Sequence, residues 1–319
     1  MVSFIVIGRN EGWKLSRCFE SVIKAVHYNS LEEYELIYVD SNSSDDSIQR
    51  AKEFSPISII KLTTVYNSAI ARNIGAKIAT GNTLLFLDGD MELIEEFLKL
   101  IYDQKNKFLH PLIGGRMLHK YHDSEGNFLY DKSYINNKSP FYKSITGGSF
   151  IINSEIWHKV GGMDNRFIAG EDPELGLRLA ATGCLLLSIP STFVIHNTNE
   201  RKASKITDLL NQKKHLFSNM LIYRKNIFNR HTLKRFWRHE KSLIALISSL
   251  ALVLATGIIP FIALYLVFVL LRVRNNHFRQ IFIDYTYYLI RDISCLLAFL
   301  LFYPIKINTD KIHYERESV

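Results

Sequence analysis

Two carboxylates stand at the end of an apolar run, where residues 84–90 read LLFLDGD. Asp88 and Asp90 are two residues apart, and Gly89 between them has no side chain. Carboxylates at this spacing can surround one ion, and Mg²⁺ and Mn²⁺ prefer oxygen ligands. A glycine also lets the backbone approach a bound molecule closely. The pattern therefore indicates a divalent cation site after a buried strand; the alternative is a turn in which Asp90 caps a helix starting at Met91.

Strands and helices alternate across the first 200 residues and must position these carboxylates. Apolar runs at 3–8, 34–40, 58–62 and 83–88 predict strands, and residues 13–27 have the helical spacing of an apolar face. This βαβ rhythm predicts an α/β domain with a mostly parallel sheet and helices on both faces. Ligands should gather at the carboxyl ends of the strands, where Asp40 and Asp88 stand.

The loop after the first strand excludes several function classes. The chain reads GRNEG there, with neither the GxGxxG of dinucleotide-binding proteins nor the GxxxxGK[ST] of a P-loop. Cys18, Cys184 and Cys295 are scattered and form no CxxC pair, so we expect no zinc site and a reducing compartment.

Five motifs then occur in a fixed order, and together they resemble the inverting family 2 glycosyltransferases. They are FIVIGRNEG (4–12), YVDSNSSDDS (38–47), AIARNIGAKIATGNTLLFLDGD (69–90), TGGSF (146–150) and FIAGEDPELGLRL (167–179). The resemblance covers about residues 3–200. It implies a Rossmann-like GT-A fold and transfer of a sugar from a nucleotide-diphosphate donor to an acceptor hydroxyl. It also implies Mg²⁺ or Mn²⁺ as cofactor, which would neutralise the diphosphate.

The resemblance assigns three residues to the metal. Asp90 would be the direct ligand, and Asp88 would act through ribose or water. His196, at the end of the apolar run STFVIH, would be a further ligand, because neutral imidazole is a suitable partner for two carboxylates. The alternative for His196 is a structural role.

The GEDPEL motif at 170–175 supplies the expected catalytic base. In the resembling family the second acidic residue removes the acceptor proton, which makes Asp172 the candidate base, with Glu171 orienting the acceptor or the loop. Because Pro173 favours the first position of a helix, Asp172 is also a candidate N-cap.

Donor contacts are expected from several loops. Asp40 would recognise the nucleoside, with an Asx turn as the alternative for it and for Asp45. Arg72 would hold the base or diphosphate through its planar guanidinium, with a surface ion pair as the alternative. For Gly147 and Gly148 the alternative to a donor contact is a turn or a β-bulge. The full set of donor-binding candidates that the resemblance implies is Arg9, Asn10, Glu11, Asp40, Arg72, Asp88, Gly147 and Gly148.

Charge is distributed unevenly along the chain. Residues 1–200 carry 20 Lys and Arg against 24 Asp and Glu, whereas residues 201–241 carry 12 against 2. The stretch 243–271 then has no charged residue and exceeds the roughly 20 residues that a bilayer crossing requires. Because basic residues beside a span stay in the cytoplasm, we expect the C-terminal region to anchor the protein to the cytoplasmic face of the inner membrane.

The expected organisation is a GT-A catalytic domain at 1–200, a basic juxtamembrane segment at 201–242, membrane-associated helices at 243–305 and a loose polar tail at 306–319. Gly257 and Pro260 interrupt the apolar run, which forms either one crossing or a hairpin; the three Arg in 272–280 favour the hairpin. The apolar stretch 281–305 forms either a second span or an interfacial helix. A helical hairpin buried in a soluble domain is the remaining alternative.

These features predict the partners. We expect a nucleotide-sugar donor, membrane lipid, and an acceptor that is a glycan or is linked to polyprenyl diphosphate. The basic segment would attract the phosphates of such an acceptor. Nucleic acid is not expected as a partner. The absence of a QxxRW motif favours one sugar per encounter, in cell-surface polysaccharide synthesis. A nucleotidyltransferase and a catalytically silent membrane scaffold are the rival interpretations.

Overall fold

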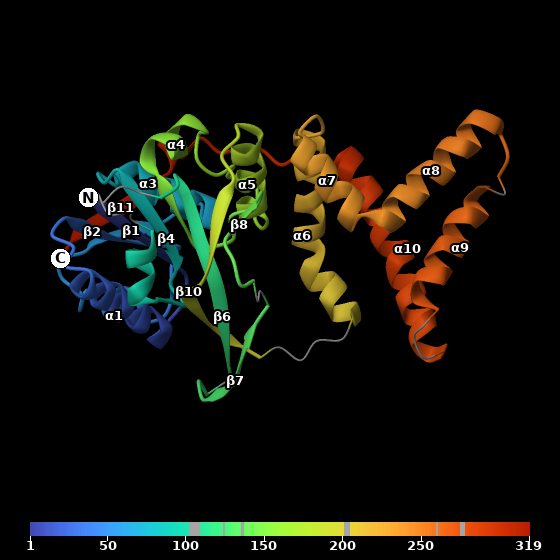
Figure 1. Cartoon of the computed structure of the whole chain (residues 1–319). Helices are drawn as coiled ribbons and strands as arrows, with labels where there is room; N and C mark the ends of the chain where they lie inside the picture. Colours follow the sequence, from blue (N-terminus) through green and yellow to red (C-terminus); the bar gives the residue numbers. More distant parts are fainter. Residues whose placement is uncertain (102–108, 124, 135–136, 201–204, 260, 275–277) are drawn as a thin grey trace. The chain divides into compact units, whose positions relative to one another are not determined.

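The structure is a computed structural model, and it describes residues 1–319 except 102–108, 124, 135–136, 201–204, 260 and 275–277. The chain forms two compact units (Figure 1). Unit 1 comprises Met1–Arg201 and Lys306–Val319, and unit 2 comprises Lys202–Ile305. The two ends of the chain therefore belong to the same unit.

Unit 1 is built on one sheet. Its elements are β1 (Val2–Gly8), α1 (Trp13–Tyr28), β2 (Tyr34–Asp40), α2 (Ser47–Ala51), β3 (Ser58–Leu62), α3 (Ser68–Ile78), β4 (Thr83–Asp88), β5 (Met91–Leu93), the 3₁₀ helix η1 (Glu95–Leu100), β6 (Leu112–His122), β7 (Phe128–Ser133), β8 (Phe141–Lys143), β9 (Phe150–Asn153), α4 (Ser154–Lys159), α5 (Glu171–Ala181), β10 (Leu186–Asn199), the 3₁₀ helix η2 (Thr309–Lys311) and β11 (Tyr314–Ser318). The four strands and the first helix predicted from apolar patterning are all present.

The sheet is mixed, so the prediction of a mostly parallel sheet is wrong. Its strand order is β11-β3-β2-β1-β4-β9-β6-β10-β5, with β7 on β6 and β8 on β10. Strands β3, β2, β1 and β4 are parallel neighbours, and β6 is parallel to β10. However, β9 lies between β4 and β6 and is antiparallel to both. Such antiparallel strands need no helical crossover, and their short apolar runs escape a search for βαβ units.

Two apolar clusters cover the faces of this sheet, as alternating strand residues require. In β1, Phe4 and Val6 belong to the cluster that includes α1. Ile5 and Ile7 belong to the other cluster, which includes apolar residues of α3, α4 and α5. Figure 1 shows α1 on the opposite side of the sheet from α3 and α4. The expected helices on both faces are confirmed.

Two further predictions fail in unit 1. The helix expected from Met91 onward is instead β5 followed by η1, because Met91 and Leu93 pair with β10, a partner about a hundred residues away. The C-terminal tail is not loose, because β11 pairs antiparallel with β3 from Tyr314 to Ser318. Both errors come from long-range strand pairing, which overrides local preference.

Unit 2 is helical. Its elements are α6 (Lys205–Lys225), α7 (Arg230–His239), α8 (Lys241–Thr256), α9 (Phe261–Val273) and α10 (Phe278–Leu301). The apolar run 243–271 is divided between α8 and α9, with Gly257 in the left-handed conformation ending α8. Among the described residues no single helix has the length and apolarity to cross a bilayer, and α7 with α8 meets the test only as a pair bent by 93°.

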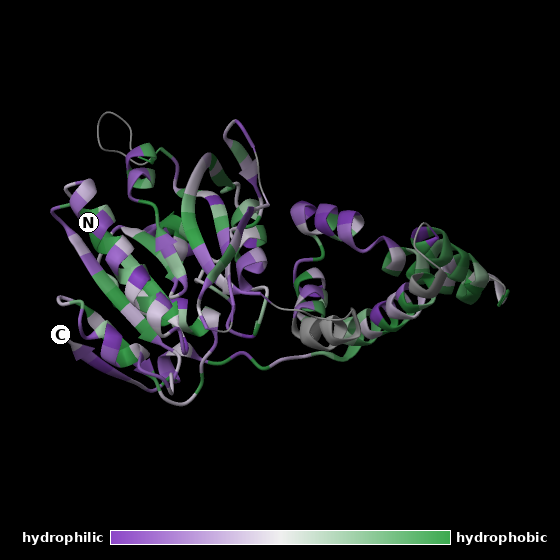
Figure 2. Cartoon of the chain, turned by 90° about the horizontal axis from the view of Figure 1, so that it is seen from below, coloured by the Kyte–Doolittle hydropathy of each residue, from purple (hydrophilic) through white to green (hydrophobic). Residues whose placement is uncertain are grey.

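Unit 2 exposes many large apolar side chains along α8, α9 and α10. Leu254 of α8 is 88% exposed, Phe282 and Leu301 of α10 are 74% exposed each, and Ile259 in the turn after α8 is 73% exposed. Figure 2 shows hydrophobic residues over much of this helical part. Contiguous exposure of this kind is unusual for a protein surface that faces only water.

A buried polar cluster connects the helices of unit 2. The Arg291 guanidinium of α10 contacts Glu240, between α7 and α8, and Asp292. The hydroxyls of Tyr223 and Tyr265 donate to Glu240 and Asp292 at 3.1 and 3.2 Å. Because each buried carboxylate has both a cation and a hydroxyl donor, the cluster holds α6, α8, α9 and α10 together.

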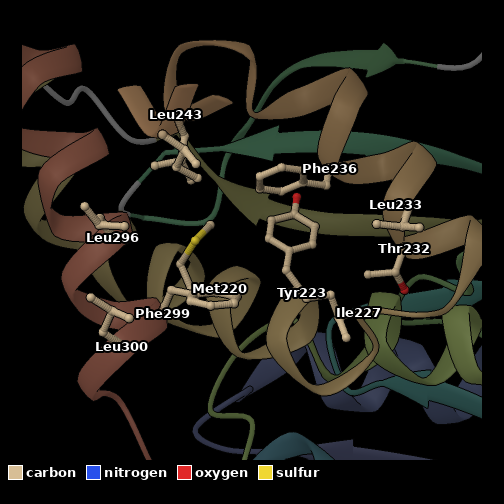
Figure 3. A pocket seen from close by; sticks show the side chains of 11 residues that line it. Met220, Tyr223, Ile227, Thr232, Leu233, Phe236, Leu243, Leu296, Phe299 and Leu300 are labelled. Carbon is tan, nitrogen blue, oxygen red and sulfur yellow. The ribbon is translucent and has the colours of Figure 1, made fainter. Parts of the chain in front are cut away.

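Unit 2 also contains a partly open apolar cavity of about 360 Å³. Figure 3 shows side chains from α6, α7, α8 and α10 around it, among them Met220, Phe236, Leu243 and Leu296. Thr232 is 1% exposed, and its hydroxyl has no hydrogen-bond partner within the described residues. The lining is otherwise almost entirely apolar, which suits a hydrocarbon occupant.

Candidate active site

The parallel strands bring three chain segments to one edge of the sheet. Gly8 pairs with Asp40, and Ile7 pairs with Asp88, so β1, β2 and β4 end side by side. The loops after these strands therefore share one pole of unit 1, as expected for ligands at the carboxyl ends of parallel strands.

Asp88 ends β4 and faces a buried arginine. Its Oδ1 lies 2.5 Å from Nη2 of Arg72. Burial raises the pKa of Asp88 to about 6, although the positive charge of Arg72 opposes the rise and the negative charge of Asp90 adds to it. The protonation state of Asp88 therefore depends on its burial and on the charges of Arg72 and Asp90.

Asp90 lies beside His196. Met91 and His196 are paired in the β5–β10 ladder, and Nε2 of His196 lies 3.0 Å from Oδ2 of Asp90. The other oxygen of Asp90, Oδ1, is buried and has no hydrogen-bond partner among the described residues. Burial lowers the pKa of His196, but the hydrogen bond and charge of Asp90 outweigh this, and the pKa is raised. Two of the predicted metal ligands are thus adjacent, with one carboxylate oxygen unused.

His119 is a site residue that the sequence did not identify. It lies on β6 opposite His196 of β10, and the two Nδ1 atoms are 3.0 Å apart. Burial and the charge of His196 lower the pKa of His119. In the sequence His119 is a lone histidine two residues before Tyr121, and no motif surrounds it. It can be recognised as a site residue only once β6 is known to lie beside β10.

No group of three or more His, Cys, Asp or Glu side chains forms a ready-made metal site in the described part of the chain. The residues nevertheless fit a cation that takes some ligands from its substrate. Asp90 offers an unpartnered oxygen, Oδ1, and Nε2 of His196 lies at the other oxygen of the same carboxylate, Oδ2. Mg²⁺ and similar ions commonly use one or two protein ligands and fill the remaining positions with phosphate and water.

Arg72 of α3 is 1% exposed, so the alternative of a surface ion pair is wrong. Its guanidinium contacts Asp88 at 2.5 Å, Glu171 at 3.2 Å and the carbonyl oxygen of Gly148 at 3.0 Å. These protein groups occupy both terminal nitrogens, and Arg72 joins β4, α5 and the 146–149 loop. Its expected contact with the donor stays a prediction.

The glycine loop before β9 approaches Asp88 closely. A Cβ atom added to Gly148 would lie 2.8 Å from Oδ2 of Asp88, so a side chain would displace the carboxylate. Gly147 has φ of 86°, a conformation that favours glycine. Thr146 donates its hydroxyl hydrogen to the carbonyl of Asp172 at 2.9 Å. The loop is thereby held between β4 and α5.

Helix α5 begins with the two candidate acids. Its N-cap is Gly170 in the left-handed conformation, and Glu171 is the first helical residue, so the prediction that Asp172 is the N-cap is wrong. Glu171 is almost buried and ion-paired with Arg72. Burial, followed by the charge of Glu171, raises the pKa of Asp172 to about 7. Asp172 is therefore able to accept a proton near neutral pH.

The loop after β1 is tied to the loop after β2. Asn10 accepts a hydrogen bond from the backbone N–H of Ser44 at 2.8 Å, and its own N–H donates to Ser43 at 2.9 Å. Arg9 is exposed, and its guanidinium lies over the ring of Tyr66 at 4.6 Å.

Burial, followed by the charge of Asp90, raises the pKa of Glu11 to about 7. Glu11 thus belongs to the acidic cluster with Asp88 and Asp90.

Asp40 is fully buried at the end of β2. Its carboxylate accepts hydrogen bonds from the hydroxyls of Tyr38 and Ser43 and, at 2.8 Å, from the Ser43 backbone N–H. Asp45 accepts one from the backbone N–H of Ser47 at 3.0 Å. The turn hydrogen bonds considered as the alternative are therefore present at both residues, and the role of Asp40 in nucleoside recognition stays a prediction.

Two models of protein families match this chain. Residues 3–158 match the model of "Glycosyl transferase family 2", and residues 112–305 match that of "Glycosyl transferase family group 2". The chain is 25% identical over 237 residues to the O-antigen biosynthesis protein RfbC of Myxococcus xanthus, covering 65% of this chain and 18% of that protein. It is 26% identical over 230 residues to mouse polypeptide N-acetylgalactosaminyltransferase 3, covering 61% of this chain and 36% of that protein. The chain thus spans well under half the length of these two relatives.

A solved structure has a similar fold. A mannosyltransferase from Pyrobaculum calidifontis, in complex with GDP-mannose and Mn²⁺, superposes with a TM-score of 0.58 at 15% sequence identity. The superposition covers 94% of this chain and 87% of that one. At this identity the likeness concerns the fold.

Proposed function

Because this chain belongs to the family 2 glycosyltransferases, we propose that it moves one sugar per encounter from a nucleotide-diphosphate sugar to a hydroxyl of a glycan acceptor, with inversion. One observation carries the proposal. Arg72 joins Asp88, at the end of β4, to Glu171, at the start of α5. The candidate metal ligands and the candidate base therefore belong to one connected cluster.

The cation would be Mg²⁺ or Mn²⁺, and the residues that would hold it are Asp90 and His196, with Asp88 acting through ribose or water. When bound, such an ion neutralises the diphosphate and the charge that accumulates on the leaving nucleotide. Asp90 has an unpartnered oxygen, Oδ1, for this role, and Nε2 of His196 lies 3.0 Å from the other oxygen, Oδ2. The Mn²⁺ in the Pyrobaculum enzyme supports the use of a divalent ion.

Asp172 would take the proton from the acceptor hydroxyl, and Glu171 would keep the start of α5 in place through Arg72. A base with a pKa near the working pH is both available and strong enough to accept the proton, and the pKa of Asp172 is about 7. The 146–149 loop, held against Asp88 and α5, would border the donor sugar. The part of the site that binds the nucleotide would be lined by Arg9, Asn10, Glu11 and Asp40.

We expect Asp90→Asn to lose the Mn²⁺-dependent part of donor affinity. The amide removes one negative charge and one anionic ligand, so donor affinity should match that of the wild type in EDTA and fall far below it in Mn²⁺. Donor binding is measured by calorimetry over a panel of nucleotide sugars, and release of nucleoside diphosphate is measured in parallel.

Asp310→Asn is a matched control, because Asp310 is a surface carboxylate paired with Lys77. Equal donor affinity of wild type and Asp90→Asn at every Mn²⁺ concentration would remove Asp90 from the site. Release of pyrophosphate in place of nucleoside diphosphate would replace the proposed reaction by nucleotidyl transfer.

The acceptor is proposed to be lipid-linked and the protein to act at the cytoplasmic face of the inner membrane, in cell-surface polysaccharide synthesis. Two features of unit 2 support this. Its exposed apolar side chains on α8, α9 and α10 suit a lipid surface, whose anionic headgroups would attract the basic α7. Its apolar cavity of about 360 Å³ suits a hydrocarbon chain.

Replacing Leu254 and Ile259 together by Asp should weaken binding to phospholipid vesicles by at least about tenfold, because each exposed side chain would lose the ~1.5–3 kcal/mol of apolar burial and gain a charge. Co-sedimentation of the full chain with vesicles measures this. Leu109→Asp is the control, since Leu109 is a half-exposed leucine of unit 1. A wild-type chain that stays in the supernatant without detergent would show that the anchor proposal is wrong.

A further inference from the structure

Exposed aromatic side chains gather on the hairpin of β6 and β7. Tyr134 is 60% exposed, Phe128 57% and Tyr130 41%. Tyr121 lies beside them, half-buried. We call Tyr121, Tyr130 and Tyr134 the tyrosine platform; none of the donor, metal or base assignments uses it. The hairpin lies at one end of β6 in unit 1 (Figure 1).

The platform has a defined geometry. Tyr121 and Tyr130 are cross-strand partners, and their rings stack with centroids 4.6 Å apart and planes 20° apart. The hydroxyls of Tyr121 and Tyr134 are 2.8 Å apart, and the Tyr130 hydroxyl donates to Glu200 at 3.2 Å. These contacts order the three rings before any ligand arrives, so binding to them loses little side-chain entropy.

The platform continues from the candidate active site. The ring of His119 lies 5.1 Å from that of Tyr134 and 6.4 Å from that of Tyr121. On its other side His119 contacts His196, which contacts Asp90. Strand register explains this arrangement, because His119 and Tyr121 are two residues apart and point to the same face of the sheet.

We propose that the tyrosine platform binds the sugar rings of the acceptor glycan. This rests on the proposed function and adds where the acceptor chain lies. The π face of a tyrosine is electronegative, and the C–H groups on one face of a pyranose are weakly positive, so the two surfaces attract. The tyrosine hydroxyls at the margin match the ring hydroxyls of a sugar as donors and acceptors.

The charges around the platform favour a neutral, hydroxyl-rich ligand over an anion. On the face of the platform, Lys132 lies over the Tyr134 ring, and Glu200 accepts a hydrogen bond from the Tyr130 hydroxyl. Both signs are thus interspersed, in contrast to the basic excess that phosphate-binding surfaces show. A nucleotide base could also stack on tyrosine, and donor binding separates the two ligands.

The test measures binding of the full chain to immobilised tetra- to hexasaccharides of four neutral series: chito-, malto-, xylo- and manno-oligosaccharides. We expect the wild type to retain at least one series, and Tyr130→Ala and Tyr134→Ala each to weaken that binding by about two- to tenfold, the value of one aromatic contact. Tyr130→Phe keeps the ring and loses only the hydroxyl, so it should weaken binding less than Tyr130→Ala does. Tyr314→Ala is the control, because Tyr314 is an exposed tyrosine on β11, at the opposite edge of the sheet.

Donor affinity is measured on the same proteins and should be unchanged in both alanine variants. The proposal is overturned if the wild type and the alanine variants bind every glycan equally, or if none of them binds any glycan. It is also overturned if the alanine variants lose donor affinity in place of glycan binding. Absence of nucleoside diphosphate release together with tyrosine-dependent glycan binding would reject the proposed transfer reaction and leave the platform as a glycan site.

Discussion

Replacing Asp172 by Asn is expected to slow sugar transfer by about 10²- to 10⁴-fold, the range for loss of a general base, while donor affinity stays near that of the wild type. Asn has nearly the size of Asp, and the Asp172 side chain caps no helix, so the fold should survive. Transfer is followed by product formation and donor binding by calorimetry on the same preparation. Transfer within about threefold of the wild type would exclude Asp172 as the base.

The pH dependence provides a second readout of the same residue. The pKa of Asp172 is raised to about 7, mainly by burial, and only the deprotonated form accepts a proton. Wild-type kcat/KM should therefore fall as the pH drops through about 7, and the residual rate of Asp172→Asn should fall less steeply, because Glu11 and Asp88 still titrate in this range but residue 172 does not. A bound cation would lower the pKa of the base, so kcat should decline at a lower pH than kcat/KM.

Glu155→Gln is the matched control for this variant. Glu155 is an exposed acid in the first turn of α4, so its replacement removes the same favourable interaction with a helix N-terminus. It lies on a different helix from the candidate base and has no assigned role in the site. A rate loss in Glu155→Gln similar to that in Asp172→Asn would indicate a general effect on the fold.

Replacing Arg72 by Met should lower the free energy of unfolding of unit 1 by about 3–5 kcal/mol. The guanidinium is buried and forms ion pairs with Asp88 and Glu171. Without it, the buried carboxylate of Glu171, the half-buried carboxylate of Asp88 and the carbonyl of Gly148 lose their partner, and unpaired buried charges are strongly destabilising. Arg72→Lys should give an intermediate loss, because an ammonium cannot reproduce the planar fork.

Urea unfolding in a Trp237→Phe background measures this, since the remaining tryptophans, Trp13 and Trp157, both lie in unit 1. Lys77→Met is the control on the same helix. Lys77 is half-exposed and pairs with the exposed Asp310, so its loss should change stability by at most about 1 kcal/mol. Similar stability of the Arg72→Met and Lys77→Met variants would contradict a stabilising role for the buried cluster.

Local patterning was sufficient to predict the N-terminal half of the sheet and the carboxylates at its edge. The strands β1 to β4 are short apolar runs separated by a helical period, and parallel neighbours end at one edge. Asp40 and Asp88 follow from this rule alone. Asp172 was identified by motif, although its place as the second residue of α5 differs from the expected N-cap, because Gly170 in the left-handed conformation starts the helix earlier.

Which side chains meet depends on long-range pairing that only the folded chain reveals. Asp90 contacts His196 only because β5 pairs with β10, and His119 joins them only because β6 is the next strand. His196 is 106 residues from Asp90 and 77 from His119 along the chain, and the free energy that selects these pairings comes from packing and ladder hydrogen bonds across the whole sheet. A local pattern carries no record of such a partner. The burial of Arg72 was hidden for the same reason, since an arginine at this position of α3 is buried only when β4, α5 and the glycine loop close around it.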